Sequence, residues 1–388
     1  MSESITSSRA PERDRPSLPA NRRRDVRERS ATGRWVALGA GLAVAAFLPF
    51  YLPEFWLQLG LLVAAATVGA LGLDLLVGHT GQVSLAHPFF IAIGAYGYTV
   101  LAADGGDGLA GLGLPASLAA PGAVAMAGAA GLCFAPIAGR VRGVYLAIAS
   151  LGLIFLGQHL LLNLTEVTGG YDGRDVPALE LFGVTFDDTG ATVLGVPFGR
   201  AERLWYVALV CSVLAYAFYA SLRGTRPGRA LAAIRLGETP AAAMGVNVAR
   251  YKAAAFGIAS LYAGVAGVLL ALALQRLVPN SYDTAMAFSY LAMVVIGGLG
   301  SPLGAVLGAA FVTSLPVLLR HYSDHLPFLA DEGSGGLSAG VASHLVFGLG
   351  MVLVLLFLPG GLASPFSSAL TAARRRRRKP ALVQGEPS

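Results

Sequence analysis

The sequence has little charge and almost no cysteine. Only 13% of its 388 residues are charged, about half of the roughly 25% found in soluble domains, whereas 55% are hydrophobic and the mean hydropathy is +0.64. Both cysteines, Cys133 and Cys211, lie inside apolar runs, which favours packed thiols over a disulfide or a metal site. This composition excludes an ordinary soluble domain and indicates a polytopic membrane protein.

Catalytic motifs are also lacking. The chain has no Walker A motif, no Gly-x-Ser-x-Gly motif and no paired carboxylates within one apolar run. His321 and His325 have the i, i+4 spacing of metal ligands, but they belong to no His-Glu-x-x-His motif. We therefore expect no catalytic residue, no metal, no cofactor and no ATP hydrolysis by this chain itself.

Ten apolar runs account for the hydropathy, and most approach the length needed to cross a bilayer. They are residues 35–52, 55–77, 85–103, 115–138, 143–164, 204–221, 253–274, 285–300, 302–319 and 341–359. The expected fold is all-α: a polytopic integral membrane protein with about ten transmembrane segments, including broken or re-entrant pieces. The short runs at 285–300 and 302–319 are the main candidates for half-helices or tilted helices.

Polar tails flank this transmembrane region, which we place at 35–360. Residues 1–34 hold nine arginines and lack the apolar core of a signal peptide, so they predict a disordered basic cytoplasmic tail. Because a membrane span follows directly, nucleic-acid binding by this tail is disfavoured. Residues 361–388 form a second basic cytoplasmic tail, and its run from Arg374 to Lys379 is suited to anionic lipid.

The basic residues are distributed unevenly between the connecting segments. If the chain begins inside, 23 of its 28 basic residues fall on the inside, and most of the acidic residues of the loops fall on the outside. Lysine and arginine accumulate on the cytoplasmic side of membrane proteins. Both termini and the polar segment 222–252 are therefore predicted to face the cytoplasm.

Segment 222–252 is rich in charge and also contains residues that typically start and end helices. Pro227 is placed to open a short helix that stops at Gly237, and Thr239 is placed to cap a second short helix. Gly245 follows the end of that helix, where a reversal of the chain favours a positive φ. A loop that merely sets topology needs no such order, so the pattern favours a surface that docks onto another protein.

Polar residues interrupt the apolar sequence between the second and third runs. They are His79, Thr80, Gln82, Ser84 and His87, with Gly78, Gly81 and Pro88 among them. Such a break is tolerated within a bilayer only where it is buried in protein or lines a watery cavity. Two interpretations stay open: an ordinary cytoplasmic turn, and a broken segment that faces a translocation path. Asp74 lies inside the second run, where a carboxylate is costly, and we expect it to be protonated or hydrogen-bonded.

Thr168, Gly169 and Gly170 form a turn after the fifth run, on the predicted outer side. Such a turn exposes backbone N–H groups, which suit an anion such as the carboxylate of an amino acid. Within the fifth run, Gln158 and His159 are better explained as hydrogen-bonding groups between helices than as a proton relay.

Four stretches of the chain resemble permeases of branched-chain amino acid ABC transporters, the LivM type. The first is the pattern Gly-x-Thr-Gly-x-x-Ser-Leu-x-His at 78–87, followed by Gly-Ala-Tyr at 94–96. The second is Thr-Gly-Gly-x-x-Gly at 168–173, after Asn-x-Thr at 163–165. The third is segment 222–252, which holds a Glu-Ala-Ala-like motif. The fourth is Ile-Gly-Gly-x-Gly at 296–300.

The sequence departs from the family pattern at several positions. In the fifth run, Phe155, Gln158 and His159 occupy the region where the family often has Glu and Arg. Ala86 stands where the family commonly has Gly, Asp74 where it has Asn, and Val167 where it has Leu; Pro240 lies within the Glu-Ala-Ala-like motif, where another residue is usual. The last departure affects the expected backbone of the loop.

The resemblance implies the permease subunit of an ATP-driven importer of branched-chain or other hydrophobic amino acids in the bacterial cell membrane. Its implied partners are a second homologous permease subunit, two ATP-binding subunits, an extracytoplasmic substrate-binding protein and the lipid bilayer. The implied substrate pathway comprises Thr80, Ser84, His87, Tyr96, Thr168, Gly169 and Gly170. The implied coupling surface comprises Arg229, Leu231, Ile234, Arg235, Glu238, Ala241, Ala242 and Gly245, with Leu231, Ile234 and Met244 as apolar anchors and the charged residues as a rim.

Two alternatives stay open beside this function. Within the same family, the substrate is urea, a short amide or another amino acid. In a different class, the chain is a self-sufficient secondary transporter coupled to protons through Asp74 and the intramembrane histidines.

The predicted topology is tested by single cysteines at Ser2, Ala233 and Asp187 and an impermeant thiol reagent applied to intact cells. Because the positive-inside distribution places only Asp187 outside, we expect Asp187→Cys to be labelled and Ser2→Cys and Ala233→Cys to be protected. Labelling of Ala233→Cys without labelling of Asp187→Cys contradicts the map.

Overall fold

The chain is described here from a computed structural model. The structure describes residues 41, 43–106, 108–141, 143–181, 184–186, 191–193, 196–322 and 361–363, with short helical pieces at 345–346, 348–350, 352–353 and 356–357. The tails predicted at 1–34 and 361–388, apart from 361–363, and His325 lie outside these residues. The chain divides into two units after Tyr51, and the first contributes the 3-10 helix η1 (Leu48–Phe50).

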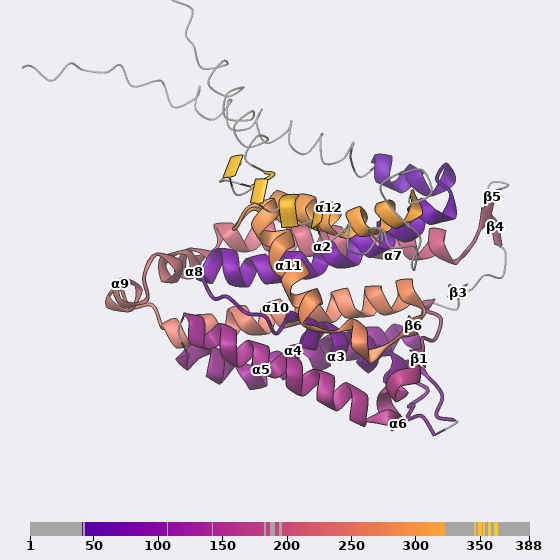
Figure 1. Ribbon diagram of the computed structural model, residues 1–388, viewed down its shortest axis with the longest axis horizontal. Coiled ribbons are helices and arrows are strands. Elements are labelled where there is room, and N and C mark those ends of the chain that lie inside the picture. The colour runs from indigo at the N-terminus through magenta and orange to yellow at the C-terminus, as the bar shows by residue number, and fades with distance from the viewer. Residues whose placement is uncertain are drawn as a thin grey trace, which may run out of the picture. The chain divides into compact units, whose positions relative to one another are not determined.

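The second unit is mainly helical (Figure 1). Its long helices are α2 (Glu54–Thr80), α3 (His87–Ala102), α4 (Ala116–Arg140), α5 (Val144–Asn163), α7 (Arg200–Gly224), α10 (Val248–Leu274), α11 (Thr284–Gly297) and α12 (Pro302–His321). The shorter ones are α6 (Thr165–Thr168), η2 (Gly170–Asp172), α8 (Arg226–Leu236), α9 (Glu238–Ala243) and η3 (Pro279–Ser281). Strands pair antiparallel as β1 (Arg174–Asp175) with β6 (Arg276–Leu277), β2 (Glu180–Leu181) with β3 (Val184–Thr185), and β4 (Ala191–Val193) with β5 (Val196–Phe198).

Six of these helices, α2, α4, α5, α7, α10 and α12, are long and apolar enough to cross a membrane. This confirms the helical polytopic membrane fold. The number of spans stays a prediction, because the runs at 35–52 and 341–359 lie partly outside the described residues. The short run at 285–300 is confirmed as α11, whose 14 residues reach about 21 Å against a hydrocarbon thickness of about 30 Å. By contrast, 302–319 lies in α12, which with 20 residues is one of the six.

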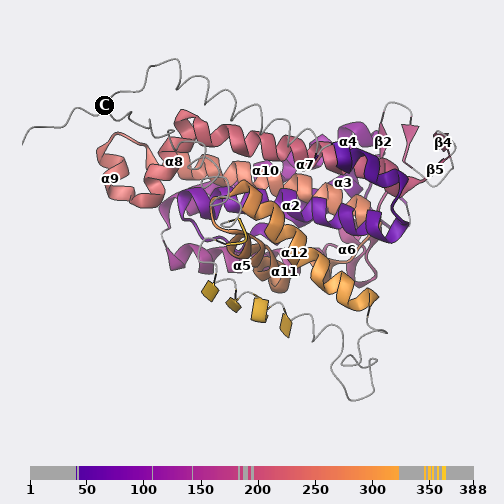
Figure 2. The ribbon, with the colours of Figure 1, turned by 90° about the horizontal axis from the view of Figure 1, so that it is seen from above.

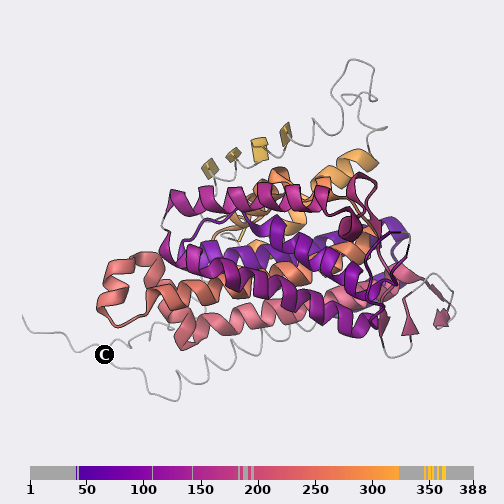
Figure 3. The same cartoon turned by 90° about the horizontal axis from the view of Figure 1, so that it is seen from below.

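Helices α2 and α10 form the centre of the second unit. About three quarters of their most apolar windows is buried, 78% and 72%, against 22–33% for the other four candidate spans. Helix α10 packs against α2, α3 and α4, while α7, α11 and α12 pack against α2 (Figures 1 and 2). Seen from below, α4 and α5 lie on the near side of the helices (Figure 3). Helix α4 packs directly against α10, whereas α5 contacts α3. The central pair therefore carries most of the buried residues of the six candidate spans.

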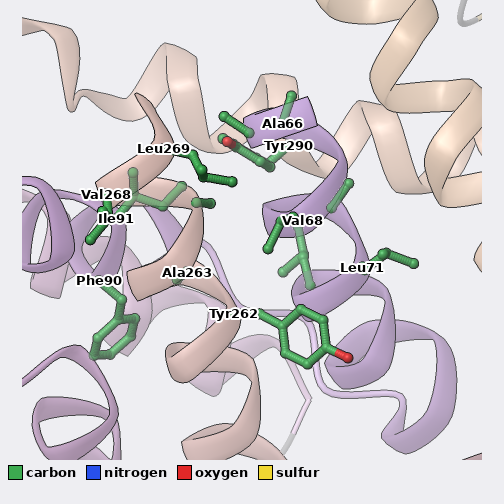
Figure 4. Close-up of a cluster of buried hydrophobic side chains, with 14 of the residues drawn as sticks. Ala66, Val68, Leu71, Phe90, Ile91, Tyr262, Ala263, Val268, Leu269 and Tyr290 are labelled. Carbon is green, nitrogen blue, oxygen red and sulfur yellow. The ribbon is translucent and has the colours of Figure 1, made fainter. Parts of the chain in front are cut away.

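Glycines make these close approaches possible. A Cβ built on Gly94 of α3 would clash with the backbone of Gly264 on α10, and one on Gly267 would clash with the carbonyl of Ile91. Where α12 packs against α11, a Cβ on Gly308 would clash with the carbonyl of Met293. Because lipid is as apolar as a leucine side chain, membrane helices associate through such close packing. Figure 4 shows the aliphatic and aromatic side chains that fill the space between α2, α3 and α10.

The close packing of the glycines predicts that substitution of Gly308 lowers stability and that substitution of Gly152 does not. Gly308→Ala should lower the thermal unfolding midpoint of the detergent-purified permease, by a free energy of about 1–3 kcal/mol, because the added methyl group meets backbone. Gly152→Ala on α5 is the matched control, since a Cβ there meets nothing within 4 Å. An unchanged midpoint for Gly308→Ala would show that α11 and α12 do not pack as closely as described.

Candidate functional site

The short helices α8 and α9 lie together at one end of the second unit, opposite the strands (Figure 1). Helix α8 begins after Thr225, whose hydroxyl accepts from the N–H of Gly228 at 3.3 Å, and it ends at Gly237. These bounds confirm the helix expected from Pro227 to Gly237. The capping role expected of Thr239 is wrong, because α9 begins one residue earlier and Gly237 is its N-cap. Gly245 has φ +82°, which confirms the left-handed turn.

The side chains of α8 divide between the chain's own core and the surface. Leu231 and Ile234 are each only 3% exposed, packed within this chain. The interpretation of these two residues as anchors for another subunit is therefore wrong, since a side chain buried at home cannot fill a pocket elsewhere. Leu236 and Met244 are 91% and 70% exposed and are the apolar side chains that α8 and α9 present outward.

Polar bonds fasten α8 and α9 to the long helices. The guanidinium of Arg235 donates to the carbonyl of Gly78 near the end of α2. The ammonium of Lys252, 1% exposed on α10, donates to the Glu238 carboxylate at the start of α9 over 2.9 Å. Glu238 is thus committed to this pair rather than to a free charged rim. Arg229 stays exposed, and its guanidinium donates to the carbonyl of Gly224 at 3.3 Å.

The Glu-Ala-Ala-like motif is also divided. Ala241 is fully buried, whereas Ala242 is exposed beside Met244. The resulting unit, α8 and α9 with Gly245, is held rigidly to α2 and α10 while it presents Leu236, Ala242 and Met244 outward. We call it the coupling unit (residues 226–245).

A buried carboxylate lies directly behind the coupling unit. Asp74 on α2 is fully buried, and its two oxygens accept from the Tyr219 hydroxyl on α7 at 2.5 Å and from the Gly300 N–H at 2.7 Å. Gly300 lies in the turn between α11 and α12. The Tyr219 hydroxyl is also 3.2 Å from Nδ1 of His79. The expectation that Asp74 is hydrogen-bonded is confirmed, and we call this cluster of Asp74, Tyr219, His79 and Gly300 the junction.

The break between α2 and α3 is confirmed as a non-helical segment, residues 81–86. It is not an ordinary exposed turn, because the side chains of Gln82 and Ser84 are only 4% and 3% exposed. The Gln82 amide donates to the carbonyl of Ala138 on α4 at 3.0 Å, and the N–H of Leu85 donates to the Ser150 hydroxyl on α5 at 2.9 Å. The segment is therefore held to both α4 and α5 by hydrogen bonds.

The residues expected along a pathway are only partly brought together. Thr80 is 5% exposed, and its hydroxyl donates to the carbonyl of Leu76 at 2.6 Å, which is a local bond within α2. His87 and Tyr96, at the start and in the middle of α3, by contrast each lie against an aromatic ring from another element. The His87 ring lies 5.3 Å from that of Tyr290 on α11, and the Tyr96 ring lies 5.8 Å from that of Tyr282.

Tyr282 and Tyr290 were missed by sequence reasoning. Both are buried: Tyr282, in the connection between α10 and α11, is 2% exposed, and Tyr290, in α11, is 4% exposed. A signal was present, because tyrosines inside or beside an apolar run need a partner for the hydroxyl. Nothing in their spacing, however, pointed to α3.

The turn at Thr168 fulfils a structural role at the opposite end. The Thr168 hydroxyl, fully buried, donates to the carbonyl of Leu161 at 2.6 Å and accepts from the Gly170 N–H at 3.1 Å. The Gly169 N–H donates to the carbonyl of Thr165 at 2.9 Å. Both glycine N–H groups are thus engaged within the chain. The expected anion site on these N–H groups is therefore not available, and the turn instead packs η2 beside η3.

Arg174 continues this turn into β1, where it pairs with Leu277 of β6. Its side chain is 3% exposed and donates to the carbonyl of Val167 at 2.9 Å. Burial lowers the pKa of the Arg174 guanidinium from its ordinary value. The bond ties the strand pair to the end of α6, which closes this end of the helices.

Comparisons with known proteins bear on this arrangement. Residues 52–356 match the family model described as the permease component of branched-chain amino acid transport systems. The chain belongs to that permease family. It is 32% identical to the high-affinity branched-chain amino acid transport system permease protein LivM of Escherichia coli K12, over 84% of this chain and 74% of that protein. It is 28% identical to the corresponding LivH of the same organism, over 76% of this chain and 89% of LivH.

A more distant relative is the probable branched-chain amino acid transport permease protein LivM of Methanocaldococcus jannaschii, which is 26% identical over 58% of the permease chain and 61% of its own. No solved structure gives a significant match. The match to LivM and LivH agrees with the resemblance noted in the sequence.

Substitutions of Asp74 test the junction. Asp74→Ala leaves the Gly300 N–H unpaired and leaves the Tyr219 hydroxyl with only Nδ1 of His79 as a partner; an unpaired buried group costs about 1–3 kcal/mol, so we expect a clearly lower thermal unfolding midpoint. Asp74→Asn keeps an acceptor for Gly300 and should retain folding, assembly and transport. An Asp74→Asn permease that assembles but does not transport would favour the proton-coupled alternative.

Proposed function

We propose that this permease is the membrane-spanning subunit of an ATP-driven importer of branched-chain or other hydrophobic amino acids. It works with a second homologous permease, two ATP-binding subunits and an extracytoplasmic binding protein that delivers the substrate. The complex lies in the bacterial cell membrane. The coupling unit faces the cytoplasm, and the strands with η2 and η3 face outward.

The observation that carries the proposal is the attachment of the coupling unit to the core. A surface loop that merely set topology would not bury Leu231, Ile234 and Ala241, nor place Lys252 in a buried ion pair with Glu238. A unit that passes a movement of the ATP-binding subunit to α2 and α10 does require such attachment, because a displacement at its exposed surface must move those helices. The junction lies one turn of α2 from the carbonyl that Arg235 binds, so α7, α11 and α12 share the same attachment.

The docking surface itself is Leu236, Ala242 and Met244, with the exposed Arg229 beside them. Apolar side chains that enter a pocket supply most of the energy of an interface, whereas exposed charges at its edge supply little. Methionine is flexible and adapts to irregular pockets. We therefore place Met244 and Leu236 in a groove of the ATP-binding subunit.

The proposal predicts that Met244→Asp and Gly245→Val uncouple transport. Met244→Asp introduces a charge into the groove, and Gly245→Val forces a branched residue to φ +82°, which costs about 1–2 kcal/mol for an ordinary residue. We expect at least a tenfold loss of leucine uptake in reconstituted vesicles. We expect the ATP-binding subunit to co-purify poorly, with the permease still inserted and paired with its partner.

Gly245→Asn is the matched control, because asparagine tolerates a left-handed conformation, and no atom lies within 4 Å of a Cβ at this position. It should retain uptake. Normal uptake and normal co-purification for both Met244→Asp and Gly245→Val would remove the coupling unit from the mechanism.

A further inference from the structure

Three deeply buried polar atoms in the second unit have no hydrogen-bond partner among the described residues. They are Nε2 of His87 and the hydroxyls of Tyr96 and Tyr282. Their side chains are 4%, 3% and 2% exposed. Two further hydroxyls of this kind belong to half-buried residues, Ser212 and Thr313, on α7 and α12. A buried polar group without a partner is costly, so each deeply buried one needs a reason.

The three atoms belong to two pairs of aromatic rings, and each pair joins α3 to the stretch that runs from η3 into α11. The rings of Tyr96 and Tyr282 are 5.8 Å apart, and those of His87 and Tyr290 are 5.3 Å apart. We call these two pairs the line. It starts beside η3 and reaches the first residue of α3, where the non-helical segment 81–86 ends.

The surroundings of this line are apolar. Figure 4 shows Tyr290 among the aliphatic side chains of Ala66 and Leu269. Gly69 of α2 leaves the space that the Tyr290 ring fills, because a Cβ there would lie 2.5 Å from the ring. A few polar groups within an apolar surround are what a small amphipathic ligand requires.

The chemistry of the three atoms matches the ends of an amino acid. A tyrosine hydroxyl donates to a carboxylate, and the imidazole nitrogen of His87 accepts from an ammonium group or donates to a carboxylate, depending on its tautomer. Aromatic faces such as that of Tyr290 attract a cation. An aliphatic substrate side chain would meet Ala66 and Leu269.

We propose that the line from Tyr282 and Tyr96 to Tyr290 and His87 is the translocation path of the permease, with the Tyr96 and Tyr282 hydroxyls binding the carboxylate of a zwitterionic aliphatic amino acid. This assignment rests on the proposed function and adds the residues that hold the substrate. Because an occupant supplies the missing partners, the hydroxyls stay free in the empty protein. The substrate then passes His87 to the segment that holds Ser84.

Tyrosine-to-phenylalanine variants separate binding from structure, since they remove only the hydroxyl. The test uses the complete complex in vesicles, with ATP and the leucine-loaded binding protein. Tyr96→Phe and Tyr282→Phe should each lower the maximal rate of leucine uptake about tenfold or more, because a hydrogen bond to a charged group is lost. Their thermal unfolding midpoints should be unchanged or higher, because the hydroxyls have no partner in the protein.

Tyr98→Phe is the matched control on the same helix. The Tyr98 hydroxyl donates to the carbonyl of Pro177 at 3.2 Å, so its removal should lower the midpoint and leave uptake near the wild-type rate. Wild-type uptake by both Tyr96→Phe and Tyr282→Phe would overturn the assignment, as would a lowered midpoint in both. A wild-type complex that takes up neither leucine nor any other branched-chain or hydrophobic amino acid would instead overturn the proposed function, and the assignment with it.

Discussion

The Asp74 carboxylate is the interaction on which the second unit depends most. It is fully buried in α2, and it accepts one hydrogen bond from α7 and one from the turn between α11 and α12. A carboxylate at this depth is expensive unless its oxygens are satisfied, so the three elements are held to one another by the penalty of separating them. Gly78 and Gly300 make the approach possible, because a Cβ on Gly78 would lie 2.5 Å from the Gly300 nitrogen.

Small residues carry the remaining constraint. In lipid there is no hydrophobic force between helices, so α10 and its neighbours are held by close packing over glycines such as Gly94, Gly264 and Gly267. Packing of this kind transmits displacement, since a closely packed interior does not yield gradually. The coupling unit, braced by Arg235 and Lys252, therefore moves with α2 and α10 or not at all.

Much of this was legible in the sequence. Apolar runs and the positions of Pro227, Gly237 and Gly245 predicted the helices and the ordered loop, because proline and glycine act through local backbone geometry. The sequence did not predict which surface an apolar side chain packs against. Leu231 and Ile234 form an apolar stripe that fits a partner's groove and the chain's own core equally well, and only the packing of α8 decides between them. The Thr168 turn misled for a similar reason, since its N–H groups are consumed by bonds that a motif does not show.

Two polar systems share the second unit, and they differ in how fully they are satisfied. At the junction, Asp74 has a partner for each oxygen, which suits an element that must stay together while it moves. Between α3 and α11, by contrast, Tyr96, Tyr282 and His87 each keep one atom without a partner among the described residues. A protein that satisfied those atoms internally would gain stability and lose affinity for a passing solute, since a bond already made is not available to a ligand. Helix α2 borders both systems: it carries Asp74 and also Gly69, which accommodates Tyr290. A shift of α2 at the junction would therefore also displace Gly69 and change the space around the Tyr290 ring, which lies 5.3 Å from the ring of His87.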